Sequence, residues 1–330
     1  MREHSTGACR AGSGTLFGRG DGSSSRLVVN GSLFEYLPDG ASPTYRALFE
    51  ARAGRNAETR ELCDEHWRRF LHLADRNFAD RFPFEFQQRW FEMYLGVSLL
   101  DMGLEVSAPK PGPDLLVRHN GTRIWFEAIA PTAGDPAHPD AVPEPHVAPP
   151  GAPPVAQWVP RDQVALRIAQ AIRRKIDAFD RYRLNRRIEP NDACIIAVNV
   201  RSIPHAWMDL IDYFLKTLYG IGDHYVVFHR DARDDGPADW GRHAIEELVR
   251  QGGAAEDAIP LVRPENAGIS AVLGSRVDAA NLPNRLGDDL LLCPHVAPAI
   301  PIPATSIPRG QYFEIQPDGD GYQARLLGHD

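Results

Sequence analysis

An Asn-Gly dipeptide between two strand-like runs constrains the fold of this chain more than any other feature of its sequence. Asn120-Gly121 separates residues 114–119 from residues 122–130, and both runs are rich in apolar and β-branched side chains. A two-residue type I′ turn needs positive φ at both central positions, which Asn and Gly adopt at little cost. The sequence therefore predicts a tight antiparallel hairpin in which His119 faces Thr122 and each further pair follows outward.

Alternation along the two strands sorts their side chains onto two faces. One face is apolar and is expected to pack on the core: Leu115, Val117, Ile124 and Phe126. The opposite face carries most of the charge of the hairpin: Asp114, Leu116, Arg118, Arg123, Trp125 and Glu127. The same register places Asp114 directly opposite Glu127.

Two directly opposed carboxylates have Cβ atoms about 5 Å apart and repel each other. A shared proton or a nearby arginine offsets part of this repulsion, and a bound divalent cation offsets it most fully. Mg²⁺ prefers oxygen ligands and is usually held by one or two carboxylates together with water and substrate phosphates. Asp114 and Glu127 therefore predict a site for Mg²⁺ (or Mn²⁺). Two solvated carboxylates paired with arginines are the alternative.

Hydrophobic periodicity gives the order of elements around this hairpin. An amphipathic helix is expected at about 56–80 and a second helix at about 84–102, before strands at 104–108, 114–119 and 122–130. A proline-rich segment at 131–160 is too dense in proline for regular structure. It leads to a helix at about 162–184 and a strand at 193–198. From residue 84 the order is helix, three strands, helix, strand.

The chain is expected to form one domain over 27–330, after a disordered Gly- and Ser-rich tail at 1–26. Its core is expected at about 84–200, followed by an α/β extension over 201–330. The elements predicted in this extension are helices near 205–219 and 241–251, strands near 224–229, 259–262, 269–273 and 288–293, and a final hairpin at 311–327.

The segment Gly112-Pro113-Asp114, followed after the hairpin by Trp125-Phe126-Glu127, resembles the PD-(D/E)XK, or restriction-endonuclease-like, nuclease superfamily. The order of elements from 84 to 200, about a third of the chain, resembles the α-β-β-β-α-β core of that family. The resemblance implies an α/β fold whose mixed central sheet is flanked by helices. It also implies Mg²⁺-dependent cleavage of nucleic acid, with Asp114 and Glu127 as metal ligands. Glu92 matches the helix glutamate that often completes the site, with Glu85 as its substitute.

The resemblance fails at one position, because Ile129 stands where the family has its lysine, two residues after Glu127. That lysine orients the attacking water and offsets charge on the phosphate, which isoleucine cannot do. Either the lysine has moved to the next helix or the site binds metal weakly or has lost its activity. Lys175 is the lysine of the helix at 162–184, and the resemblance therefore makes it the candidate catalytic lysine.

The same helix is strongly basic. Residues 161–187 hold nine Lys or Arg against three Asp, a local net charge of +6 in a chain whose net charge is −8. Gln163, Arg167 and Arg174 share one stripe of the helix at spacings of four and seven. We expect this stripe to contact the phosphate backbone of nucleic acid, with DNA as the first expectation and Trp125 or Trp158 nearby. A solvated basic face is the alternative.

Composition excludes several other classes of protein. No run approaches the roughly 18 apolar residues of a membrane span, and no apolar N-terminal stretch resembles a signal peptide, so the expected location is cytoplasmic. The cysteines form no CxxC pair, which excludes a zinc ribbon and a disulfide framework. Cys194 and Cys293 lie in apolar runs and are expected in the core.

Two rival functions stay open. The first is a catalytically inactive nuclease-like domain that binds nucleic acid or a partner protein, and Ile129 is its main support. The second is a metal-free hydrolase that uses the same carboxylates, as in glycoside hydrolysis. The sequence does not decide between DNA and RNA, and it does not give the sequence specificity, the pathway or the oligomeric state, a homodimer included.

Overall fold

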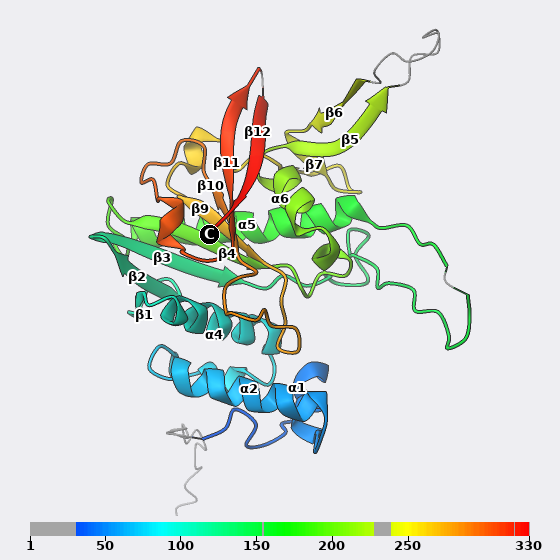
Figure 1. Ribbon diagram of the computed structural model, residues 1–330, viewed down its shortest axis with the longest axis vertical. Coiled ribbons are helices and arrows are strands. Elements are labelled where there is room, and N and C mark those ends of the chain that lie inside the picture. Colours follow the sequence, from blue (N-terminus) through cyan, green and yellow to red (C-terminus); the bar gives the residue numbers. More distant parts are fainter. Residues whose placement is uncertain (1–30, 154, 228–238, 320, 330) are drawn as a thin grey trace, which may run out of the picture. The chain divides into compact units, whose positions relative to one another are not determined.

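Within residues 31–153, 155–227, 239–319 and 321–329, which the computed structural model describes, eight strands form one mixed sheet (Figure 1). The central strands β3, β4 and β9 run parallel to one another, and the pairs β1–β2 and β2–β3 are antiparallel. The order across the sheet is β1 (Glu105–Ser107), β2 (Leu115–His119), β3 (Thr122–Ile129), β4 (Ala193–Asn199), β9 (Ala271–Ser275), β10 (Leu291–Pro294), β11 (Gln311–Asp318) and β12 (Gly321–Gly328).

Helices cover both faces of this sheet. One face packs against α4 (Phe86–Asp101), and α2 (Arg55–Phe70) and α3 (Phe78–Arg81) pack on α4, with α1 (Pro43–Glu50) on α2. The other face packs against α5 (Arg161–Leu184) and α6 (Leu210–Leu218). Every residue of β4 is buried, as expected of a parallel strand that is covered on both sides. The protein thus has the predicted α/β architecture, with a mixed central sheet flanked by helices.

The predicted hairpin and its register are confirmed. The Cα partners run from His119–Thr122 to Leu115–Phe126, and the turn residues Asn120 and Gly121 have φ values of 49° and 79°. The expectation that one face of the hairpin stays polar is wrong, because Leu116, Trp125 and Glu127 are buried on the α5 side. The chain returns from β3 to the parallel strand β4 through α5, and this crossover helix packs on that face.

Other elements of the N-terminal half lie close to their predicted positions, with one interruption. The helix expected at 56–80 stops at Phe70, and a separate short helix, α3, begins at Phe78. The proline-rich segment forms no helix or strand over 131–153 and 155–160. The tail predicted at 1–26 lies outside the described residues.

The extension departs further from its prediction. The helix expected at 241–251 is wrong, because these residues form β6 (Asp239–Ala244), which pairs with β5 (Ile221–Val227), and β7 (Glu247–Val249), which pairs with β8 (Ala255–Asp257). Local helix propensity is a weak preference that strand pairing overrides. The strand expected at 259–262 is a turn, whereas the hairpin at the C-terminal end is confirmed. Single 3₁₀ turns occupy Ala206–Met208, Pro264–Asn266 and Ala304–Ser306.

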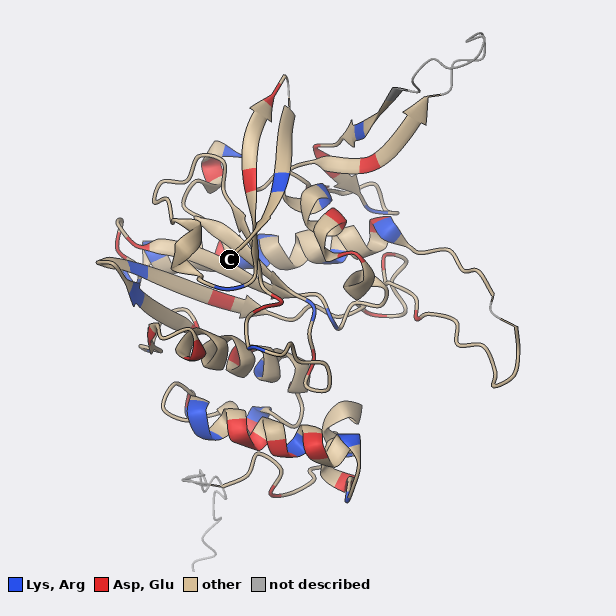
Figure 2. Cartoon of the chain, in the orientation of Figure 1, with Lys and Arg blue, Asp and Glu red and all other residues tan. Residues whose placement is uncertain are grey.

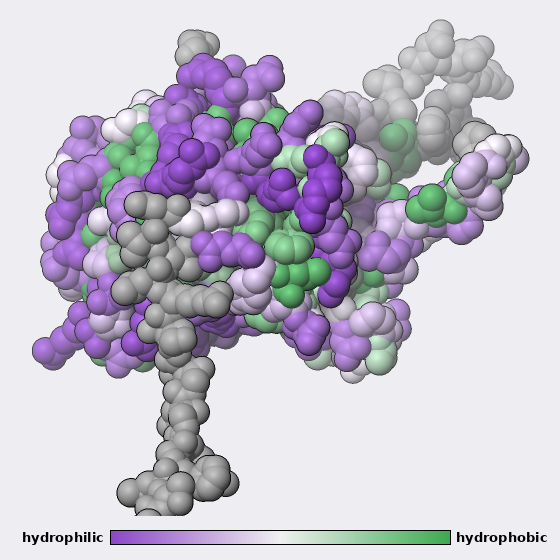
Figure 3. Space-filling view, turned by 90° about the horizontal axis from the view of Figure 1, so that it is seen from below, coloured by the Kyte–Doolittle hydropathy of each residue, from purple (hydrophilic) through white to green (hydrophobic). Residues whose placement is uncertain are grey.

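The surface and the interior agree with the composition. Cys194 and Cys293 are buried and unpaired, as expected of core residues. Viewed from below, from the side of α1 and α2, hydrophilic residues cover most of the visible surface, with smaller hydrophobic areas between them (Figure 3). Among the described residues, none of the helices combines the length and the apolar character of a membrane span.

Gly96 lets α4 lie close to α2. A Cβ atom at this position would stand 2.6 and 2.8 Å from two ring carbons of the fully buried Phe70. We expect Gly96→Ala to lower the free energy of unfolding by about 1–3 kcal/mol, because overpacking outweighs the better helix propensity of alanine. Urea unfolding measures the loss. Gly252→Ala is the control, since a Cβ there meets no atom within 4 Å, and an equal loss in both variants would contradict the packing argument.

Candidate active site

Three carboxylates lie near the α4–β3 contact, and the central one, Asp114, interacts electrostatically with Glu92 and with Glu127. Glu92 belongs to α4, Asp114 immediately precedes β2, and Glu127 lies near the end of β3, where Figure 2 shows one acidic band close to the arrowhead. The last strand pair is Leu115–Phe126, so Asp114 occupies the next position along the hairpin, on the side of Glu127. Asp114 lies close enough for its charge to raise the pKa of both glutamates.

Glu127 is the most constrained of the three. Its carboxylate is buried, and Oε1 accepts a hydrogen bond from Lys175 Nζ at 2.8 Å. Its other oxygen, Oε2, is buried and has no hydrogen-bond partner among the described residues. Burial, and then repulsion from Asp114, raises the pKa of Glu127, while the charge of Lys175 acts in the opposite direction. Lys175, the candidate lysine from the sequence, is thus bonded to the carboxylate of Glu127, and its catalytic role stays a prediction.

Glu92 is buried on α4 and is paired with Arg89, whose Nη1 lies 3.0 Å from Glu92 Oε2. Arg89 also bonds Glu85 through Nε at 3.1 Å, and Glu85 bonds Arg81 at 2.6 Å. Glu85 thus belongs to an ion-pair group at the start of α4. Glu92 is the α4 carboxylate whose charge interacts with Asp114.

The pKa of Glu92 leads to a pH-dependent prediction. Burial, and then repulsion from Asp114, raises this pKa to about 8, so the folded protein binds the proton more tightly than the unfolded chain does. The stability contributed by this group is fully present below about pH 4.5 and is lost as the pH rises through about 8. We expect Glu92→Gln to raise the melting temperature at pH 8.5 and to change it little at pH 5. The exposed Glu61→Gln is the control, and an equal shift at both pH values would contradict the prediction.

Three further side chains belong to the site, and the sequence reasoning missed them. Lys110 Nζ lies 3.4 Å from the carbonyl oxygens of Pro113 and Asp114, and its charge lowers the pKa of both glutamates. Burial, and then the charges of Glu127 and Asp114, raises the pKa of Tyr182 to about 12. Gln88 bonds the backbone at the end of β3. Helical spacing could have identified two of them, because Gln88 precedes Glu92 by one turn and Tyr182 follows Lys175 by two.

Arg167 and Arg174 lie on α5 on the N-terminal side of Lys175. Arg174 is exposed. The pKa of Arg167 is lowered first by its own burial and then by the positive charge of Arg174. Arg167 is half-buried and donates to Thr132 O and Gln170 Oε1, both at 3.0 Å. The guanidinium of Arg167 thus fixes the start of the proline-rich segment directly after β3, and Arg174 is left to face solvent.

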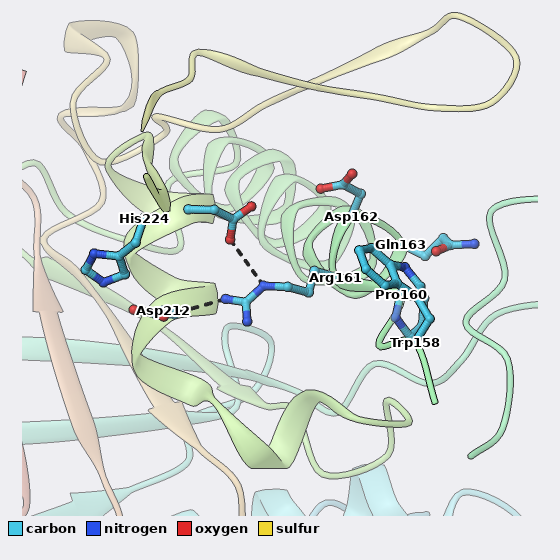
Figure 4. Close-up of a pocket in the computed structure, with 8 residues that line it drawn as sticks. Trp158, Pro160, Arg161, Asp162, Gln163, Asp212 and His224 are labelled. Atoms are coloured by element: carbon cyan, nitrogen blue, oxygen red, sulfur yellow. Dashed lines mark ion pairs between the residues drawn. The ribbon is translucent and has the colours of Figure 1, made fainter. Parts of the chain in front are cut away.

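Gln163 does not belong to this site. It precedes Lys175 by twelve residues, about 18 Å along the helix axis. It lines a separate cavity of about 450 Å³ at the start of α5, together with Trp158, Arg161 and Asp212 (Figure 4). A stripe at spacings of four and seven continues along the whole of this long helix, so shared spacing does not place its members at one site.

The separate cavity is organised by ion pairs. Arg161 lies 3.3 Å from Asp209, 3.6 Å from Asp212 and 3.2 Å from Asp223, and Figure 4 shows its guanidinium directed at two of these carboxylates. Lys216 is buried beside it and bonds Asp223 at 2.9 Å. Asp209, Asp212 and Asp223 thus neutralise Arg161, so its guanidinium is not free to hold a phosphate in this cavity.

The two tryptophans expected near the substrate differ in their surroundings. Trp125 is buried, and its Nε1 donates to Asp192 at 2.8 Å, so its ring is not on the surface where a substrate could stack on it. Trp158 is 89% exposed and stands beside Gln163 in the cavity at the start of α5.

The residues at Asp114 suit a hard divalent cation. The donor set consists of carboxylate oxygens, and one of them, Glu127 Oε2, is buried and accepts no hydrogen bond from the described residues. Among the described residues, no group of three or more His, Cys, Asp or Glu side chains is close enough to hold an ion by itself. Carboxylate oxygens are the donors that Mg²⁺ and Mn²⁺ prefer, usually as one or two carboxylates completed by water and substrate phosphates.

Comparison of the chain with protein-family models, with curated proteins and with solved structures found no match.

Proposed function

We propose that this protein is a Mg²⁺- or Mn²⁺-dependent nuclease with a restriction-endonuclease-like core, and that DNA is its first candidate substrate. One observation carries the proposal: a buried glutamate on β3 stands next to Asp114 and is bonded at 2.8 Å by Lys175 from the following helix. Two carboxylates and a lysine are the set that the resemblance to PD-(D/E)XK nucleases implies. Here the lysine comes from α5, since β3 has Ile129 at the usual position.

Each residue has a role in this proposal. Asp114 and Glu127 hold the ion, and Glu92 supports them from α4. The bound ion supplies Lewis-acid activation of water and stabilises charge at the scissile phosphate. The ammonium group of Lys175 orients the nucleophile and offsets negative charge that develops during cleavage. Arg174, exposed on the same helix, attracts the phosphate backbone.

The free-energy cost of placing Glu92, Asp114 and Glu127 close together favours a binding site over a purely structural network. Removing charges from water costs several kcal/mol per ion, and a structural network satisfies its buried oxygens. Glu127 Oε2 is not satisfied, and Asp114 repels both glutamates. An ion that binds between them would remove both penalties.

The direct test measures cleavage of plasmid, linear duplex, single-stranded DNA and RNA by the full chain. We expect cleavage with Mg²⁺ or Mn²⁺ and none with EDTA, and we expect Mn²⁺ to raise the melting temperature without substrate. Absence of cleavage of every substrate, together with a melting temperature that does not respond to Mn²⁺, would contradict the proposal.

A catalytically inactive nucleic-acid-binding domain is the second candidate. The ion pair between Lys175 and Glu127 favours it, because each charge already neutralises the other without metal. An inactive domain would retard DNA on a gel at low salt while its melting temperature stays unchanged by Mn²⁺.

A further inference from the structure

Strand β3 extends beyond its neighbour β2 at the end that carries Glu127. The pairing with β2 ends at Leu115–Phe126, whereas β3 continues to Ile129 and stays paired with β4 on its other side. From residue 127 onward, no described strand pairs with the edge of β3 that faced β2. Buried backbone N–H and C=O groups need partners, so the groups at this edge must be satisfied in another way.

Two side chains take the place of the missing strand. Ala128 N donates to Asp114 Oδ2 at 2.8 Å. Gln88 Nε2 donates to Ala128 O at 3.2 Å, and Ala130 N donates to Gln88 Oε1 at 2.9 Å. The primary amide of Gln88 offers one donor and one acceptor side by side, as a peptide unit does. Gln88 therefore continues the hydrogen-bond ladder of β3 past the point where β2 begins.

These bonds connect the elements that supply the three carboxylates. Gln88 lies one turn before Glu92 on α4, and it holds the backbone on both sides of Ile129, next to Glu127. Asp114 holds the same strand through Ala128. Apolar packing also holds α4 on the sheet, and this packing has no direction of its own.

We infer that Gln88 is a positioning residue of the proposed metal site: its two hydrogen bonds to the end of β3 fix Glu127 relative to Glu92 and Asp114. This inference rests on the proposed function. Glutamine acts here through the strand and does not touch the ion. Groups that orient metal ligands in this way typically change metal affinity 10- to 100-fold when they are removed.

The test compares Gln88→Met with Gln87→Met in the full chain. Methionine has a similar length and lacks the amide, and Gln87 is the preceding, half-buried residue of α4. Mn²⁺ binding is measured by calorimetry at a temperature at which both variants are folded. We expect Gln88→Met to raise the Kd for Mn²⁺ at least about tenfold and Gln87→Met to change it less than about twofold. Equal Kd values, with only the melting temperature of Gln88→Met lowered, would overturn the inference.

A second measurement separates this inference from the proposed function. If the wild type and Asp114→Asn bind Mn²⁺ equally weakly, the proposed function fails, and metal-free crystal structures of both glutamine variants then decide on Gln88. Loss of the 2.8 Å contact between Lys175 Nζ and Glu127 Oε1 in Gln88→Met alone supports positioning. Retention of this contact in both variants overturns it.

Discussion

Replacing Asp114 by Asn, or Glu127 by Gln, is expected to lower kcat/KM for metal-dependent DNA cleavage by at least about 10³-fold, because each change removes an anionic ligand at the centre of the proposed site. Both substitutions keep the shape of the side chain. Asn retains an oxygen for the bond from Ala128 N, so the strand geometry at this point is preserved. Loss of activity would then report charge and ligation rather than misfolding.

Stability provides a second readout for the same variants. Asp114 raises the pKa of Glu92 and of Glu127 through repulsion, so Asp114→Asn is expected to raise the melting temperature in metal-free buffer and to abolish the further increase with Mn²⁺. Such an exchange of stability for function is typical of active sites. Glu105→Gln is the matched control, because that side chain is 76% exposed on β1. Cleavage at wild-type rates by both Asp114→Asn and Glu127→Gln would contradict the nuclease assignment.

Lys175→Met is expected to have the second large effect, on activity and on stability together. Without the ammonium group, Glu127 is left buried and unpaired, and breaking a buried ion pair in this way costs about 3–5 kcal/mol. Loss of the group that orients the nucleophile is expected to lower kcat/KM by about 10²- to 10³-fold. Chemical denaturation and cleavage kinetics measure the two effects separately.

Metal and a second substitution distinguish a catalytic Lys175 from a structural one. Mn²⁺ is expected to restore more stability to Lys175→Met than to the wild type, because the ion then supplies the missing positive charge. Lys175→Met combined with Glu127→Gln is expected to regain stability and to stay inactive. Arg173→Met is the control, since Arg173 is exposed on the same helix and its ion-pair partner among the described residues is Asp177. Full activity of Lys175→Met would exclude the lysine from the mechanism.

Local patterns predicted the elements around the site well. The Asn-Gly turn, the alternation along its strands and the helical periodicity on either side gave β2, β3, α4, α5 and β4 within a few residues. These signals depend on neighbours in the chain, and the structure preserves them. The helix expected at 241–251 failed because pairing of β6 with β5 and of β7 with β8 decided the conformation there.

The sequence by itself determined that Asp114 and Glu127 lie together, because a two-residue turn leaves only one register between the two strands. It also identified Lys175 as a candidate, since the basic helix holds a single lysine. Which cations of that helix approach the carboxylates depends on how α5 rotates about its axis, and the burial of its apolar stripe against β3 and β4 sets this rotation. Lys175 borders this stripe beside the buried Ile176, whereas Arg174 points to solvent. Only the tertiary structure decided the contact between Lys175 and Glu127 and the bonds from Gln88 to β3. Each of these joins segments whose relative placement depends on the packing of the core.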